Sequence, residues 1–225
     1  MNTWTHLDRS GMGNAFLADG EPDVAQWIDD YTGYRCMVNR CDRSGHLCGY
    51  VGVPEGHRLW GIEYTRQISV SSDWMEGREL DDRTSPIDLL CMGLDGADKP
   101  SLSIFFEVHG GLTYSRATGG AEHLERVKLN RPEQLEDYVT NPQEWMCFLD
   151  ERGETLSTWF WGFDCHHSGD GDLSNDRLFF GGPYRDFKYV TSEVTNLAAQ
   201  VKRLDEMVKE DPSVLLPSDE GKPTE

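Results

Sequence analysis

The chain has 225 residues, and its 21 Lys and Arg stand against 40 Asp and Glu, which gives a formal net charge of −19. This sign of charge excludes binding to a nucleic-acid backbone through bulk electrostatics, because such binding needs a basic face. The content of 37% hydrophobic and 11% aromatic residues excludes a wholly disordered chain. We therefore expect a folded protein with a heavily charged surface.

Targeting and membrane signals are not found in the sequence. No run approaches the roughly 18 apolar residues of a membrane span, and the first residues lack the basic and apolar regions of a secretory signal. The six cysteines are scattered, without the regular spacing of a disulfide framework. We expect reduced thiols, a cytoplasmic location, no membrane association and no direct binding to nucleic acid.

Domain organisation follows from length and composition. One domain of ordinary size accounts for residues 23–210. Residues 1–22 mix Gly, Asp, Asn and Thr without a period, which predicts an N-terminal arm or loop. Residues 211–225 are acidic and contain three prolines, which predicts a flexible tail.

The predicted elements begin with a short helix at residues 23–30. Two β-rich runs, 33–40 and 46–53, flank a turn with Gly45 and predict a hairpin. A second short helix is expected at 86–92, where Pro86 suits the first helical position. Residues 101–108 predict a strand that the double glycine at 110–111 interrupts, and the aromatic run at 155–164 predicts another strand.

The C-terminal region changes to a helical period from Tyr184 onward. Apolar residues recur at alternating steps of three and four, which is typical of one apolar helix face. Such a stripe is either the core face of a docked helix or the seam of a dimer, so the oligomeric state stays open. With the expected hairpin strands, the sequence predicts a single α+β domain, mainly an antiparallel sheet packed against a long C-terminal helix. The stripe consists of Phe187, Val190, Val194, Leu197, Val201, Leu204 and Val208.

Polar residues gather where two of the predicted strands end. Side chains two apart on a strand share a face, so Glu107 and His109 are expected to point the same way. A second polar group follows the aromatic strand, and the two groups converge if these strands are neighbours. Ligand-binding candidates are therefore Glu107, His109, Asp164, Cys165, His167 and Asp170, with His57 at the edge of the site.

Histidine, cysteine and carboxylate together suit Zn²⁺ or another divalent transition metal, and we expect His109, His167 and Cys165 to be its ligands. Two other hypotheses stay open. In one, His109 and Cys165 are packed structural residues and the acids face water. In the other, Cys165 is a nucleophile with His109 or His167 as its base, which requires an accessible thiolate of low pKa.

Four segments occur together in the chain: HLCGYVGVPEGH (46–57), EVHGGLTYS (107–115), WFWGFDCHHSGD (159–170) and YRDFKYVTSEVTNLAAQV (184–201). They resemble an uncharacterised family of proteins encoded in bacteriophages and prophages, in which versions of all four occur in this order. The resemblance covers most of residues 30–205 and implies a phage or mobile-element product that acts in the cytoplasm of a bacterial host cell, but no established activity. In the family pattern a small residue stands at the position of His166, which leaves Cys165, His167 and Asp170 as the better candidates.

Two functions fit these observations, and the sequence does not decide whether either is enzymatic. The first is a cytoplasmic pocket protein that binds a small polar ligand or a metal through the His, Cys and carboxylate cluster. The alternative is a non-enzymatic acidic phage factor that binds and blocks a basic host protein, such as a defence or nucleic-acid-binding component. Inward-facing acids and histidines favour the first, and a ribbon of exposed acids favours the second.

Overall fold

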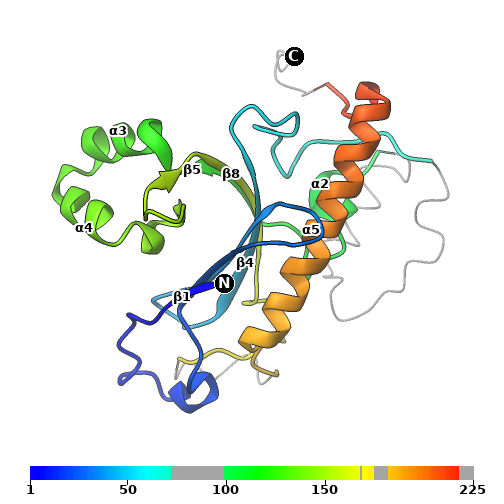
Figure 1. Cartoon of the computed structure of the whole chain (residues 1–225). Helices are drawn as coiled ribbons and strands as arrows, with labels where there is room; N and C mark the ends of the chain where they lie inside the picture. The colour runs from blue at the N-terminus through cyan, green and yellow to red at the C-terminus, as the bar shows by residue number, and fades with distance from the viewer. Residues whose placement is uncertain (72–98, 168, 175–181, 218–225) are drawn as a thin grey trace, which may run out of the picture.

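The computed structural model of the chain describes residues 1–71, 99–167, 169–174 and 182–217. Its centre is a sheet of six strands in the order β1-β2-β3-β4-β8-β5, and all neighbours are antiparallel. The strands are β1 (Asn2–Trp4), β2 (Val24–Ile28), β3 (Arg35–Arg40), β4 (Leu47–Pro54), β5 (Tyr114–Thr118) and β8 (Thr158–Asp164). The long helix α5 (Phe187–Glu210) crosses one side of the sheet, and α3 (Gly120–Asn130) and α4 (Leu135–Thr140) lie on the other (Figure 1). The predicted α+β class is confirmed.

Strands β3 and β4 form the predicted hairpin, with a register that runs from Arg35 opposite Gly52 to Arg40 opposite Leu47. Gly45 closes its turn in the left-handed region, at a φ of 75°, and its N–H donates to Cys41 O at 2.8 Å. A Cβ at this position would lie 2.7 Å from Leu173. The hairpin turn therefore requires glycine, and it packs closely against the segment that follows β8.

The alternation of side chains along the strands separates two apolar layers. Trp161 and Phe163 of β8 point into the large core under α5, whereas Phe160 points to the opposite face. On that opposite face Phe160 packs with Phe148 of β6 (Phe148–Leu149), which pairs with β7 (Thr155–Leu156). The aromatic run at 155–164 is thus confirmed as strand, and it needs both layers to cover its large side chains.

Helix α5 confirms the predicted helical period. Asp186 caps its first turn, because its carboxylate accepts a hydrogen bond from the backbone N–H of Tyr189 at 2.7 Å. The apolar stripe is buried against the sheet within one chain, which makes it a core face. The buried apolar residues of α5 are Val190, Val194, Leu197, Ala198, Val201, Leu204 and Val208, and Phe187 is half-buried.

Two predicted elements are wrong. Residues 23–30 contain strand β2 instead of a helix, because pairing with β3 over five positions outweighs local propensity. The predicted strand at 101–108 is the short helix α2 (Leu102–Phe105) followed by a turn. Its apolar residues Leu102 and Phe106 are four apart, so one helical turn buries both of them in the core.

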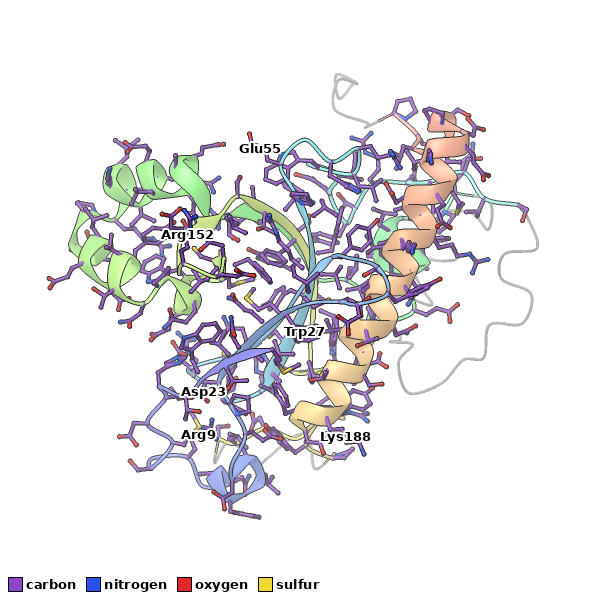
Figure 2. All side chains as sticks on the ribbon, viewed as in Figure 1. Arg9, Asp23, Trp27, Glu55, Arg152 and Lys188 are labelled. Carbon is purple, nitrogen blue, oxygen red and sulfur yellow. The ribbon has the colours of Figure 1, made fainter. Side chains whose placement is uncertain are left out.

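Residues 1–22 are attached to the sheet more closely than an arm would be. Strand β1 pairs with β2, and the buried carboxylate of Asp23 accepts hydrogen bonds from Arg9 and from Arg40 (Arg9 and Asp23 are labelled in Figure 2). Burial alone would raise the pKa of Asp23, but hydrogen bonds from Leu7 N–H and from Arg9 hold it below its usual value. The N-terminal segment is therefore fixed by a buried ion pair.

The beginning of the expected flexible tail is also ordered. The 3-10 helix η4 (Pro212–Val214) follows α5, and Leu215 forms a bridge with Ile68. The N–H of Leu216 donates to Gln67 O at 3.1 Å. Residues 211–216, which we expected to begin a flexible tail, are therefore held against the rest of the protein.

Helices α3 and α4 lie in a stretch for which the sequence patterns predicted no element. The lobe that they form, residues 120–149, is joined to the sheet by Gln26. The side chain of Gln26 donates to Cys147 O at 2.7 Å and accepts from Leu149 N–H at 3.0 Å.

The helix predicted at 86–92 lies outside the described residues. In the described part of the chain, no helix combines the length and the apolar character that a membrane span requires.

We predict that Leu197→Asp lowers the free energy of unfolding by at least about 4 kcal/mol, because it removes a buried apolar side chain and places an unpaired charge in the core. Ala199→Asp, on the exposed side of the same helix, should cost less than about 1 kcal/mol. Urea unfolding followed by circular dichroism measures both. Equal losses, or a stable Leu197→Asp monomer from a wild-type dimer, would contradict the core-face assignment.

Candidate functional site

The candidate site lies where the segment after β8 meets the turn after α2 and the first half of α5. Strand β8 ends at Asp164, and Cys165 N–H still donates to Leu47 O of β4 at 3.1 Å. The chain then makes a tight turn in which His167 N–H donates to Asp170 Oδ2 at 2.9 Å and Asp170 N–H donates to His167 O at 3.0 Å. This turn fixes His167 and Asp170 relative to each other.

The turn after α2 carries His109 into the same place. Gly110 and Gly111 both adopt left-handed backbone conformations, at φ values of 66° and 77°. A Cβ at Gly110 would lie 2.1 Å from the ring of His167, so only glycine lets the two turns touch. On its other side the turn is held by α5, where Glu193 accepts a hydrogen bond from His109 N–H at 3.0 Å.

Three side chains from these turns converge. His109 Nε2 lies 2.8 Å from Asp170 Oδ2, and the rings of His109 and His167 are 5.4 Å apart. One potential ligand atom from each of His109, His167 and Asp170 lies within 4.8 Å of the other two. His109 and Asp170 each expose 3% of their side chain, and His167 exposes 26%. The group is therefore buried on two sides and reachable at His167.

The carboxylate of Asp170 is the most stabilised charge in this group. Burial alone would raise its pKa, but hydrogen bonds from His109 and His167 outweigh burial and hold the pKa well below its ordinary value. Arg185 adds a hydrogen bond from Nε to Asp170 Oδ1 at 3.1 Å. Asp170 is thus ionised at any physiological pH.

Helix α5 supplies the outer contacts of the group. Tyr189 Oη lies 3.0 Å from His109 Nδ1, so each ring nitrogen of His109 has a partner. Because a carboxylate only accepts, His109 carries a proton on Nε2 in this arrangement, and a neutral ring accepts from the Tyr189 hydroxyl at Nδ1. The guanidinium of Arg185 lies over the Tyr189 ring, 4.8 Å from its centroid, which fixes Tyr189 from the outer side.

The structure brings together three of the seven predicted site residues, His109, His167 and Asp170, and places Asp164 at their edge. Asp164 Oδ1 lies 4.0 Å from His167 Nδ1, and its other oxygen accepts a hydrogen bond from Thr113 Oγ1 at 2.9 Å. The expected convergence of the two segments is therefore present. It arises from two turns instead of two strand ends.

Cys165 lies in the core under α5, with 1% of its surface exposed. Burial raises the pKa of its thiol well above the ordinary value, and the charge of Asp170 raises it further. A thiol in this environment stays protonated, which argues against Cys165 as a nucleophile. Among the described residues, the group with metal-binding geometry contains Asp170 where the sequence led us to expect Cys165.

Glu107 and His57 do not belong to the group. Residue 107 is exposed, and its backbone binds Gln200, with the N–H donating and the carbonyl accepting. The expectation that Glu107 shares a face with His109 is wrong because the segment is a turn, not a strand. His57 Nε2 lies 3.6 Å from Asp205, which is 16 residues, or roughly 24 Å of helix, beyond Tyr189.

Sequence reasoning missed Arg185, Tyr189 and Glu193. Tyr189 and Glu193 are four apart and thus lie on one face of α5, directly beside the apolar residues Val190 and Val194. Glu193 is 7% exposed, which is unusual for a carboxylate. In the sequence, the position of Glu193 beside an otherwise apolar stripe could have indicated that this acid is buried and binds a polar group.

Comparisons of the chain with models of known protein families, with curated proteins and with solved structures give no significant match.

We predict that Asp170→Asn costs about 3–5 kcal/mol at pH 7 in the presence of a chelator, because it removes one partner of a buried ionic network. Since folding lowers the pKa of Asp170, its contribution is fully present above the unfolded value of about 3.9 and is lost as the pH falls further. The difference between wild type and Asp170→Asn should therefore shrink below about pH 4. Urea unfolding from pH 7 to pH 3 measures it.

The control is Asp172→Asn, two residues further along, where the carboxylate pairs with the exposed His166 at 3.2 Å. A surface pair of this kind contributes at most about 1 kcal/mol. Equal costs for the two variants, or a difference that does not depend on pH, would show that Asp170 is not the charged centre of the network.

Proposed function

We propose that the protein binds a divalent transition metal through His109, His167 and Asp170. The observation that carries the proposal is that one imidazole or carboxylate donor atom from each of these residues lies within 4.8 Å of the other two. Two imidazoles and a carboxylate bind Zn²⁺ in catalytic sites and Fe²⁺ in facial-triad sites. In both cases three protein ligands leave coordination positions for water or a small ligand.

The outer contacts support this proposal. Ligating histidines usually donate their second ring N–H to a fixed acceptor, and ligating carboxylates are hydrogen-bonded in turn. Tyr189 Oη stands at His109 Nδ1, and Arg185 Nε donates to the oxygen of Asp170 that does not face His109. Binding at His109 Nε2 would move the ring proton to Nδ1, where the tyrosine oxygen can accept it.

The choice of metal follows from the donor set. Imidazole nitrogen with one carboxylate oxygen suits Zn²⁺ and Fe²⁺, and a hard oxygen-seeking ion such as Mg²⁺ or Ca²⁺ is disfavoured. Zn²⁺ is the first candidate because its sites accept four ligands, of which the chain provides three. When bound, Zn²⁺ would supply Lewis acidity. Because the His167 side chain is partly exposed, the fourth coordination position of the metal would be accessible from that side.

The biological setting is a proposal from the sequence resemblance. Asp164, Cys165, His167 and Asp170 stand in the segment that resembles the phage and prophage family, and His109 stands in another such segment. We place the protein in a bacterial cytoplasm on this basis. The acidic factor that blocks a basic host protein remains a second candidate, favoured by exposed acids such as Glu122, Glu125, Glu133 and Glu136 on the α3–α4 lobe.

Elemental analysis of protein purified without chelator tests the metal proposal. We predict stoichiometric Zn²⁺ or Fe²⁺ in the wild type, and a melting temperature that falls when a chelator removes the metal, because binding energy is also folding energy. His167→Ala should abolish binding and keep the fold, since His167 is only half-buried. His109→Ala should abolish binding as well.

The matched control is His166→Ala, which removes the neighbouring imidazole that stacks on His46 and faces Asp172 outside the site. This variant should keep its metal. Metal retained in both His109→Ala and His167→Ala, or no uptake when Zn²⁺ is added to the chelator-treated wild type, would overturn the proposal.

A further inference from the structure

A second potential site lies on the opposite side of the sheet from α5. It is a pocket of about 610 Å³ between the edge strand β5 and the α3–α4 lobe. No residue of the metal group takes part in it, so it is independent of the proposed function. The lining consists of Asp42, Tyr114, Arg116, Thr118, His123, Arg126, Val127, Asn130, Arg131, Gln134, Asp137, Glu144, Trp145 and Met146.

Two elements present their regular faces to this pocket. On β5 the lining residues Tyr114, Arg116 and Thr118 are two apart, which puts them on one face of the strand. On α3 the lining residues His123, Arg126 and Asn130 are three or four apart, which puts them on one face of the helix. The pocket is therefore walled by whole secondary-structure faces, and its side chains start from fixed backbones.

Two arginines of this pocket, Arg116 and Arg126, are not neutralised by a salt bridge within the described part of the chain. Arg126 Nη2 donates to Ala117 O at 2.9 Å, which holds the guanidinium beside β5. Arg126 Nε is buried and has no hydrogen-bond partner among the described residues. Within the same described part of the chain, no carboxylate forms a salt bridge with Arg116 or Arg126. Among the described residues, therefore, neither guanidinium is tied to an acidic partner, and Arg126 Nε is left as a donor without an acceptor.

His123 adds a neutral donor to the same wall. Its Nδ1 accepts a hydrogen bond from Gly119 N–H at 2.8 Å, so the neutral ring carries its proton on Nε2. Burial lowers the pKa of His123, and the charges of Arg126 and Arg116 lower it further, to about 4 in total. At neutral pH these three residues thus offer two guanidinium groups and one neutral imidazole N–H.

The lining also contains three acidic residues, Asp42, Asp137 and Glu144. Asp137 accepts hydrogen bonds from Trp145 Nε1 at 2.9 Å and from Asn141 Nδ2 at 3.1 Å. Burial raises the pKa of Glu144, and the charges of Asp137 and Asp42 raise it too. The pocket thus combines basic and acidic lining residues with the larger side chains of Tyr114, Trp145 and Met146.

We infer that this pocket binds a small organic phosphate, with the phosphate at Arg116, Arg126 and His123 and an apolar or aromatic body along Tyr114, Trp145 and Met146. Guanidinium groups match phosphate oxygens with paired N–H donors. Three donor groups suit the three free oxygens of a phosphate monoester better than the two of a carboxylate. The aromatic lining residues Tyr114 and Trp145 suit a ring.

Phenyl phosphate is the probe for this site. We expect the full-length protein to bind it with a dissociation constant of about 1 mM, as suits so small a ligand, and to gain melting temperature at about ten times that concentration. Benzoate should bind more weakly, and benzylamine, a cation of similar shape, should not bind. In a histidine NMR titration, bound phosphate should raise the pKa of His123 from about 4, because it opposes the field of Arg126 and Arg116.

Arg116→Gln should weaken binding at least tenfold and keep the fold, because residue 116 is exposed on an edge strand. Arg126→Gln should abolish binding. The matched control is Arg152→Gln, an exposed arginine outside the pocket lining (Arg152 is labelled in Figure 2), which should bind like the wild type. Absence of binding, equal binding of benzylamine, tighter binding of benzoate, or unchanged binding by a folded Arg116→Gln protein would overturn the inference.

Discussion

The arrangement of the site depends on the hydrogen bonds that the buried carboxylate of Asp170 accepts. This carboxylate accepts hydrogen bonds from His109 of the turn after α2, from the backbone of His167 in its own turn and from Arg185 just before α5. Three segments that are far apart in the sequence are thus joined through one charge. Because an ionised carboxylate in a buried place is stable only with such donors, the donors and Asp170 require each other.

Local periodicity predicted the elements that carry their own signal. The hairpin of β3 and β4, the aromatic strand β8 and the stripe of α5 follow from alternation or from steps of three and four, since each packs one face on the core. The convergence of His109, His167 and Asp170 was expected, but from a wrong premise. Gly110 achieves it as a turn residue that permits close approach to His167, whereas we expected a strand that pointed His109 inward.

The remainder depends on contacts that no local pattern encodes. Strand β2 forms because β1 and β3 pair with it, and the core covers Cys165, which leaves Asp170 beside the two histidines. Charge shows a similar limit. The net charge of −19 argues against a basic face, yet Arg116 and Arg126 stand beside a pocket without an acidic partner among the described residues. An overall charge does not describe a local site.

Anomalous diffraction at the zinc edge, from crystals grown with Zn²⁺, tests most directly whether His109, His167 and Asp170 form a metal site. We predict one strong peak at about 2.0–2.2 Å from His109 Nε2, from a ring nitrogen of His167 and from a carboxylate oxygen of Asp170. A site without an anomalous peak, in which His109 Nε2 keeps its 2.8 Å contact with Asp170 in the presence of Zn²⁺, would contradict it.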